Sequence, residues 1–252
     1  PETATERQQT LGADIIMCLD QCIAAHETEE KVRLAMVRTH QWAAICHQIN
    51  AGNHKQALFG IVQGGIYPHL REESAKTITA MDFSGYAIGG LAVGESKRVM
   101  YQVTEQVASL LPTDKPRYLM GVGSPEDLVE CVSRGVDIFD CVLPTRVARN
   151  GGLFTQTGRV NISSARFKDK MEPVDEECDC TTCSNYSSAY LHHLFKIGEL
   201  LGLRLATVHN LRFILRLMEQ MRCAIVEGTF AQYKHEFLTC LLYTSPSPRD
   251  RG

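Results

Sequence analysis

Short hydrophobic segments alternate with amphipathic segments along the first part of the chain. Each hydrophobic segment ends at glycine or a polar residue, which is typical of a buried strand; these segments are 13–19, 57–62, 85–88, 117–120 and 136–139. Between them, apolar residues recur at helical spacing over 29–48, 69–81 and 96–111. Strands that alternate with helices predict a parallel sheet covered by helices.

The segment between 117–120 and 136–139 carries the clearest helix signals. Ser124 suits an N-cap, Pro125 suits the first turn, and the two acidic residues that follow complement the helix dipole. Gly135 is the type of residue that closes a helix. We therefore predict a helix that begins at Pro125 and ends before Gly135.

Two architectures fit this alternation, the open doubly wound sheet and the (β/α)8 barrel. Both place functional residues at the carboxyl ends of the strands. The segment 121–125 lacks the third glycine of a dinucleotide-binding fingerprint, which weakens the doubly wound alternative. A closed barrel needs more strands than are visible here, so the barrel interpretation requires strands upstream of Pro1.

Composition and charge narrow the class of protein. A content of 44% hydrophobic and 22% charged residues is typical of a globular chain, and no apolar run is long enough to span a membrane. No signal sequence is recognisable, so the ten cysteines predict a reducing, cytoplasmic setting. The net charge of −3 argues against a protein that coats nucleic acid. A local polyanion contact and a solvated charged surface are both open interpretations of one basic stretch: Arg146, Arg149, Arg159, Arg166, Lys168 and Lys170.

Three closely spaced cysteines predict a metal site. Cys178, Cys180 and Cys183 can converge from one tight turn. His209, just before a helical segment, can supply a fourth ligand, and four protein ligands would make a closed, structural Zn²⁺ site. The alternative fourth ligands are two histidines of an apparent helix, His192 and His193.

Polar residues and glycines directly follow the predicted strands. Asp140 and Asp20 are candidate catalytic carboxylates because each stands at a strand end. Gln63 with its following glycines, and the pair Gly89-Gly90, could let backbone approach a flat ligand. Ordinary turns and helix caps use the same residue types, so each feature alone leaves both interpretations open.

Together these segments resemble the tRNA-guanine transglycosylase family over almost all of 1–237. The resemblance rests on motifs in the family's order and spacing: 13–20, 60–65, 88–95, 117–123, 137–146 and the set Cys178, Cys180, Cys183 and His209. It implies an α/β protein, a (β/α)8 barrel with a zinc-binding subdomain. On this scheme 1–150 is the C-terminal part of the catalytic barrel and 151–240 is the zinc-binding subdomain with the last barrel helices. The Ser/Pro/Arg-rich segment 241–252 is expected to be a non-native or disordered tail.

The resemblance also implies a reaction. Members of the family exchange guanine at the anticodon wobble position of tRNA for a 7-deazaguanine base, in queuosine biosynthesis. The strand-end aspartate, here Asp140, attacks C1′ of the flipped-out nucleotide and forms a covalent ester, as the nucleophile of a retaining glycosidase does. The implied substrates are tRNAs with a GUN anticodon and either preQ1 or guanine.

Base-binding roles follow from the same resemblance. Asp20 is expected to accept hydrogen bonds from the N–H edge of the base, and Gln63 and the N–H of Gly90 to bind its carbonyl oxygen. Leu91 would offer its backbone carbonyl to an aminomethyl substituent, and Met120 would pack on the ring.

Features outside the base site complete the implied picture. Arg146 and Arg149 are expected to hold the RNA, and Cys22 and Val93 resemble the bacterial branch, which favours preQ1 over queuine. The family implies a homodimer. Its general acid/base aspartate would lie upstream of Pro1, so we expect the isolated chain to lack base exchange. The alternatives are a non-catalytic tRNA-binding accessory subunit of the same family, and a barrel glycosidase that uses both aspartates.

Overall fold

The computed structural model describes residues 1–243, and of 241–243 it describes the backbone alone. Helix α10 (Phe230–Tyr243) enters the segment expected to be a tail, and the rest of that segment, 244–252, lies outside the described residues. The chain folds as two compact units. The first comprises 1–122 and 130–141, and the second comprises 123–129 and the residues from 142 onward.

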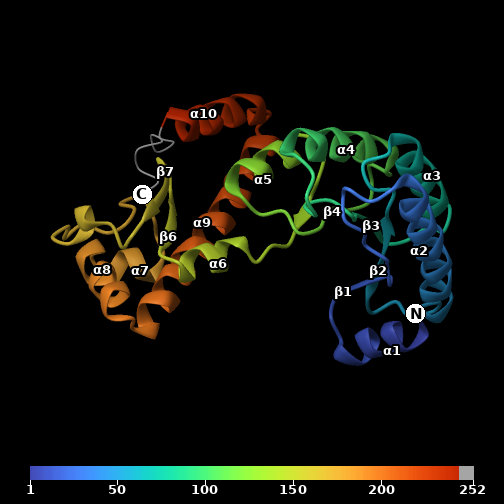
Figure 1. The fold of residues 1–252 in the computed structure, drawn as a ribbon, viewed down its shortest axis with the longest axis horizontal. Helices are drawn as coiled ribbons and strands as arrows, with labels where there is room; N and C mark the ends of the chain where they lie inside the picture. Colours follow the sequence, from blue (N-terminus) through green and yellow to red (C-terminus); the bar gives the residue numbers. More distant parts are fainter. Residues whose placement is uncertain (244–252) are drawn as a thin grey trace. The chain divides into compact units, whose positions relative to one another are not determined.

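The first unit contains a five-stranded parallel sheet whose strands follow each other in sequence order, β1-β2-β3-β4-β5 (Figure 1). A doubly wound sheet reverses its strand order at a switch point, whereas a barrel does not, so the sequential order confirms the barrel-type α/β fold. The elements up to β5 are α1 (Glu2–Leu11), β1 (Ile15–Met17), α2 (Glu29–Ile49), β2 (Ala57–Val62), α3 (Pro68–Thr79), β3 (Gly85–Ile88), α4 (Lys97–Leu110), β4 (Arg117–Leu119), α5 (Pro125–Val132) and β5 (Ile138–Phe139).

The strand register aligns the carboxyl ends of the strands. Val62 pairs with Ile88, Ile88 with Leu119, and Leu119 with Phe139. The residue that follows each of these positions therefore lies at the same edge of the sheet. This edge carries Gln63, Gly89, Met120 and Asp140.

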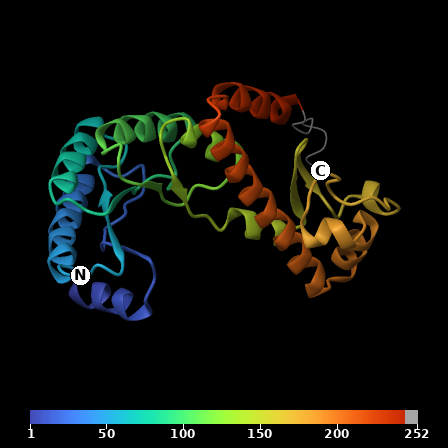
Figure 2. The ribbon, with the colours of Figure 1, turned by 180° about the vertical axis from the view of Figure 1, so that it is seen from behind.

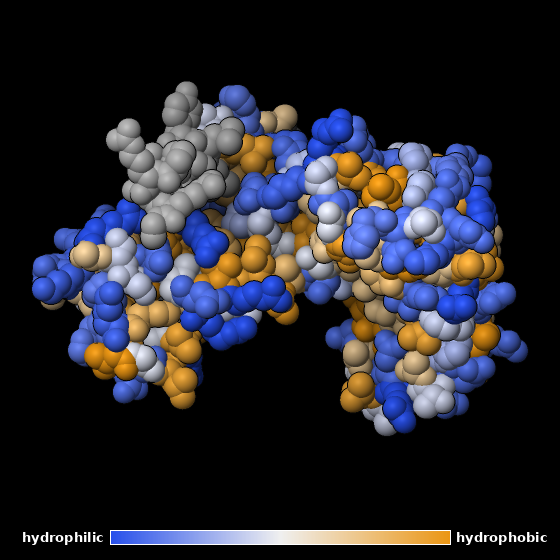
Figure 3. Space-filling model, viewed as in Figure 1, coloured by the Kyte–Doolittle hydropathy of each residue, from blue (hydrophilic) through white to orange (hydrophobic). Residues whose placement is uncertain are grey.

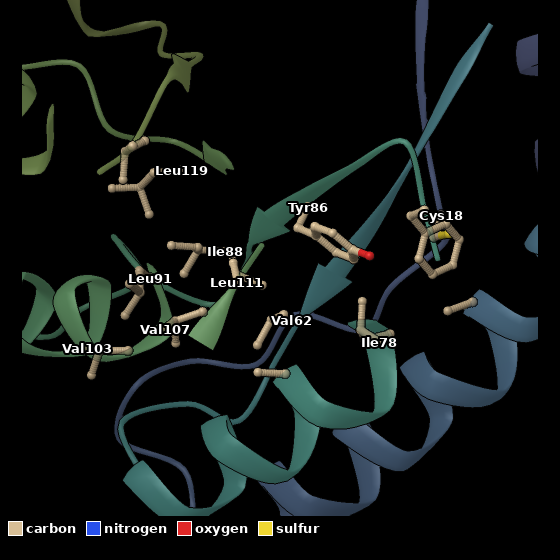
Figure 4. Packing of buried hydrophobic residues seen from close by; sticks show 14 of the residues in the cluster. Cys18, Val62, Ile78, Tyr86, Ile88, Leu91, Val103, Val107, Leu111 and Leu119 are labelled. Atoms are coloured by element: carbon tan, nitrogen blue, oxygen red, sulfur yellow. The ribbon is translucent and has the colours of Figure 1, made fainter. Parts of the chain in front are cut away.

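Helices α2, α3 and α4 lie on one face of the sheet, as the outer layer of a barrel does (Figures 1 and 2). Side chains from β2 and β3 pack against these helices in one hydrophobic core (Figure 4). Val62 meets Ile78 of α3, and Ile88 and Leu91 lie near Val107 of α4. The core thus holds the carboxyl ends of the central strands rigidly, which is what a site built there needs.

Strand β1 is shorter than the segment 13–19 predicted for it. At Met17 the outer edge of β1 pairs with a side chain, because Gln8 accepts from the Met17 N–H at 2.9 Å and donates to the Met17 carbonyl at 2.8 Å. Leu11, Ile15 and Leu19 are exposed near this edge, and Figure 3 shows hydrophobic side chains at the surface there. Among the described strands, β1 and β5 thus form the two open edges of the sheet.

The second unit is built around the long helix α9 (Leu200–Val226). An antiparallel hairpin of β6 (Gly152–Thr155) and β7 (Gly158–Asn161) packs on it, which the sequence did not predict. The remaining elements are α6 (Leu143–Arg149), the 3-10 helix Ala165–Phe167, α7 (Thr181–Asn185) and α8 (Ser188–Ile197). None of the described helices is long and apolar enough to span a bilayer.

Candidate functional site

The carboxylate of Asp20 lies against the amide of Gln63 at the carboxyl edge of the sheet. Gln63 Nε2 donates to Asp20 Oδ2 at 2.6 Å, and the Gln63 side chain is buried. Burial raises the pKa of Asp20 above its ordinary value, and the hydrogen bond from Gln63 opposes that shift only in part. The edge therefore holds a half-buried carboxylate whose partner is a neutral amide, an arrangement that suits a ligand with N–H donors.

Two glycines let the Gln63 amide lie directly on the backbone that follows β3. A Cβ added at Gly90 would lie 2.5 Å from Gln63 Oε1, and one at Gly89 would lie 2.6 Å from Gln63 Nε2. Gly90 also has φ +65, in the region that favours glycine. Residues larger than glycine would displace Gln63, so close packing requires this pair.

The turn beyond Gly90 is held by an acidic side chain. Ala92 has φ +58, and the carboxylate of Glu95 accepts hydrogen bonds from the N–H groups of Ala92 and Val93. Leu91, the residue between, is buried in the core. The backbone at Leu91 is thereby fixed. Met120, in the neighbouring turn, is half-buried, and its N–H reaches the carbonyl of Ile88 at 3.5 Å.

Asp140 presents its carboxylate in a fixed orientation after β5. Its Oδ1 accepts from the Tyr118 hydroxyl at 2.6 Å and from the Gly121 N–H at 2.9 Å. Oδ2 accepts no hydrogen bond from the part of the chain that the structure describes, and the side chain is exposed. Burial, aided by Asp140, raises the pKa of Tyr118, so its phenol remains a donor at neutral pH. One carboxylate oxygen is thus anchored while the other faces outward.

Sequence reasoning missed Tyr118. Its register partner is Ile138, two residues before Asp140. Side chains two residues apart on a strand point to the same face, so Tyr118 and Asp140 share a face of neighbouring strands. Tyr118 could therefore have been found from the alternation of side-chain direction along β4 and β5, by stepping back two positions from the strand end that Asp140 follows.

The four predicted metal ligands come together in the second unit. The ligand atoms of Cys178, Cys180, Cys183 and His209 all lie within 4.8 Å of one another, and all four residues are buried. Cys180 caps α7, where its sulfur accepts the Cys183 N–H at 3.3 Å. Hydrogen bonds with the neighbouring cysteines hold the pKa of the Cys180 thiol well below its ordinary value, which favours the thiolate that binds metals.

The orientation of His209 fits a metal ligand. Its Nε2 lies 2.7 Å from the Phe154 carbonyl oxygen, so Nε2 carries the proton and Nδ1 is left as the acceptor. Nδ1 lies 3.7 Å from Cys180 Sγ and 3.3 Å from Cys183 Sγ. A tetrahedral Zn²⁺ site with its usual bond lengths separates N and S ligands by about 3.6 Å. The donor set and its spacing therefore fit a closed structural metal site.

Two details of the metal-site prediction were wrong. His209 lies inside α9, not before a helix, and so presents Nδ1 from a rigid element. His192, one of the alternative ligands, instead places Nδ1 2.8 Å from the carbonyl oxygen of Ile162. His192 lies on α8 and does not belong to the cluster of ligand atoms that the described residues form.

Almost the whole described part of the chain also matches a known family. The family model for queuine tRNA-ribosyltransferase matches residues 1–241. The chain belongs to this family. The queuine tRNA-ribosyltransferase match includes both the strand-end residues and the cysteine cluster.

Individual queuine tRNA-ribosyltransferases are similar to the chain along most of its length. The protein of that name from Dehalococcoides mccartyi is 52% identical over 252 residues, which is 99% of this chain and 63% of that protein. Those from Desulforamulus reducens and Staphylococcus aureus are also 52% identical, over 94% of this chain and 64% and 62% of their own lengths. The chain thus spans slightly less than two thirds of the length of these curated relatives.

The two arginines expected to hold RNA lie on one exposed side of α6. Arg146 and Arg149 are exposed, whereas Val147 and Ala148 between them are buried. Within the described residues neither guanidinium forms an ion pair. They are available for phosphate groups, whose bidentate recognition suits arginine.

Proposed function

We propose that the protein is a tRNA-guanine transglycosylase, a pentosyltransferase that exchanges guanine at the wobble position of tRNAs with a GUN anticodon for a 7-deazaguanine base. The observation that carries the proposal is the anchored carboxylate of Asp140, beside Met120, Gly89 and Gln63 at one edge of the sheet. A nucleophile held next to a flat, hydrogen-bonding base site is what glycosidic base exchange requires.

In the proposed reaction, Asp140 is the nucleophile. Its outward Oδ2 attacks C1′ of the flipped-out nucleotide, the C1′–N9 bond breaks, and the electron pair of that bond goes to guanine, which takes up a proton. The incoming base then attacks C1′ through its own ring nitrogen, which loses a proton, and the carboxylate leaves. Two displacements give net retention, as in retaining glycosidases. Tyr118 and Gly121 hold Oδ1 throughout and keep the carboxylate oriented.

The base would be recognised by Asp20 and Gln63, whose side chains already contact each other. In the structure, Gln63 donates to Asp20 and so satisfies its half-buried carboxylate. A bound guanine would offer its own N–H donors to Asp20, while Gln63 and the Gly90 N–H would turn to its carbonyl oxygen. The backbone carbonyl of Leu91 would then receive the aminomethyl group that distinguishes preQ1, which we propose as the incoming base.

The metal cluster would serve the reaction indirectly. Cys178, Cys180, Cys183 and His209 would hold one Zn²⁺, which joins the loop 178–183 to α9 and leaves no coordination position for substrate. On α6 of the same unit, Arg146 and Arg149 would contact the phosphates of the tRNA.

The proposal is tested by exchange of radiolabelled guanine into tRNA. We expect incorporation into a tRNA with a GUN anticodon and none into the same tRNA with adenosine at the wobble position. Because the chain spans slightly less than two thirds of the length of its relatives, the assay is run with this chain alone and with the chain extended by its own coding sequence. Absence of exchange by the extended protein would contradict the proposed function, and exchange by this chain alone would contradict the expected inactivity.

The affinity for guanine should fall in acid because of Asp20. Burial raises the pKa of this carboxyl, and only the ionised form accepts two N–H donors, so binding is lost as pH falls through the raised pKa. Below it, we expect the dissociation constant of guanine to rise by about tenfold per pH unit. Calorimetric titration from about pH 7.5 to about pH 4.5 measures this dependence.

The matched variant Asp20→Asn separates binding from stability. It should bind guanine weakly at every pH, with a flat profile. A raised folded-state pKa means that the ionised carboxyl disfavours the fold as pH rises, so Asp20→Asn should unfold no more easily at neutral pH. A variant that kept the acid-dependent affinity would show that another group titrates.

A further inference from the structure

Arg71 of α3 is an arginine whose side chain is completely buried in the first unit. Burial lowers its pKa to about 10, with Glu95 opposing the shift, so the guanidinium remains charged at neutral pH. A buried charge is tolerated only when it is well hydrogen-bonded. The partners of Arg71 therefore show what the charge is used for.

The guanidinium bonds to main-chain carbonyls that follow two neighbouring strands. At the last residue of β2 and in the turn after it, Nη1 donates to the Val62 carbonyl at 3.0 Å and Nε donates to the Gly65 carbonyl at 2.7 Å. After β3, Nη1 donates to the Gly89 carbonyl at 2.7 Å and Nη2 donates to the Gly90 carbonyl at 3.2 Å. One planar side chain thus ties together the two turns that carry Gln63 and Gly90. Lysine, with a single ammonium group, cannot reproduce this fork.

These bonds fix the direction of a backbone N–H. The chain has no cis peptide bond among its described residues, and in a trans peptide the C=O and N–H point in opposite directions. With the Gly89 carbonyl held toward Arg71, the N–H of the same peptide, which belongs to Gly90, points away from it. Gly90 itself lies against the Gln63 amide, because a Cβ added at Gly90 would lie 2.5 Å from Gln63 Oε1. The N–H therefore faces the side of the turn where Asp20 and Gln63 meet.

We propose that Arg71 is a positioning residue for base recognition, which aims the Gly90 N–H at the carbonyl oxygen of the bound purine by holding the carbonyls of Gly89 and Gly90. The inference rests on the proposed function, because it assumes that the base binds beside Asp20 and Gln63. On this inference, Arg71 determines how well the site distinguishes a purine with a 6-oxo group from one without it, whereas Asp20 binds the N–H edge of the base.

The affinities of guanine, 6-thioguanine and hypoxanthine distinguish this positioning role from a merely structural one. 6-Thioguanine keeps the N–H donors of guanine but replaces its carbonyl oxygen with sulfur, a weaker acceptor. Hypoxanthine keeps the oxygen but lacks the 2-amino group that Asp20 would bind. Dissociation constants are measured calorimetrically for the full-length, zinc-loaded protein and for Arg71→Lys, which retains the charge.

We expect the unaltered protein to prefer guanine over 6-thioguanine by at least about tenfold, and Arg71→Lys to reduce this preference below about threefold. The preference for guanine over hypoxanthine should stay the same in both. The matched control is Arg117→Lys, because Arg117 also donates to main-chain carbonyls, those of Leu111 and Gly135, but from the beginning of β4. It should leave both preferences unchanged.

The outcomes distinguish the inference from the function on which it rests. If the unaltered protein does not bind guanine, the proposed function fails and the inference fails with it. If guanine binds and Arg71→Lys keeps the preference over 6-thioguanine, or loses both preferences equally, the inference alone is overturned. If Arg71→Lys does not fold, the unaltered protein labelled with ¹⁵N-glycine decides: guanine must shift the Gly90 amide resonance more than 6-thioguanine does, and equal shifts would overturn the inference.

Discussion

Replacing Asp140 with asparagine is expected to abolish base exchange and the covalent adduct with tRNA in the chain extended upstream of Pro1. The carboxamide has the size of the carboxylate and can still accept from Tyr118 and Gly121 through its oxygen, so the turn after β5 should be preserved. It carries no negative charge to capture C1′, however. Removal of a catalytic nucleophile typically lowers turnover by at least about 10³-fold. Radiolabelled guanine exchange measures the loss, and an SDS-stable protein–tRNA band reports the ester.

The matched variant for this test is Tyr118→Phe. It removes one of the two donors to Asp140 Oδ1 but leaves the carboxylate in place. We expect the adduct to form with a rate lower by about tenfold, because the nucleophile is less well oriented. Thermal unfolding of both variants should match that of the unaltered protein. A normal adduct in Asp140→Asn would show that a different residue forms the ester, and would leave Asp140 a structural acceptor.

The sheet could be predicted from sequence because its signals are local. The apolar runs 57–62 and 85–88 end at polar or glycine residues, and both strands are confirmed at those bounds as β2 and β3. Ser124 accepts the Asp127 N–H at 3.3 Å, as its N-cap position predicted. The strand-end positions of Asp140 and Gln63 follow directly from these elements, since parallel strands end at one edge.

The features that were missed depend on contacts between distant segments. The hairpin β6–β7 is short, and it is held by Asn210, which accepts the Phe154 N–H and donates to the Gly152 carbonyl. No local pattern reports a partner that lies far along the chain in α9. Arg71 is a similar case, because on a helical pattern it looks like an ordinary polar position of 69–81. Its burial arises only when two turns from other strands surround it.

His209 shows why a residue can be assigned to the correct cluster from sequence and still be placed in the wrong local structure. The two residues before it, Thr207 and Val208, are β-branched and have modest helix propensity. In the structure, packing of α9 against α6, α7, α8 and β6 outweighs that preference. The ligand set itself was predictable because thiolates and imidazole at this spacing have few other uses in a reduced protein.

The second large effect is expected on the metal content of the protein when a ligand cysteine is replaced. We expect about one Zn²⁺ per chain, falling below about a tenth of that in Cys180→Ala, because three remaining ligands cannot close the tetrahedron. Loss of the ion would leave buried thiols and the buried His209 ring without their common partner, so the second unit should unfold at a clearly lower temperature. Elemental analysis and thermal unfolding followed by circular dichroism measure the two effects.

Cys223→Ala is the matched control for this test, because Cys223 is an exposed cysteine on α9, the helix that also carries His209. It should retain the full metal content and the unfolding temperature of the unaltered protein. Chelation of the unaltered protein should reproduce the lower unfolding temperature of Cys180→Ala, and added Zn²⁺ should restore stability to the chelated protein but not to the variant. Equal zinc in Cys180→Ala and Cys223→Ala would contradict the ligand assignment. Loss of stability without loss of metal would instead mean that Cys180 acts only through its cap on α7.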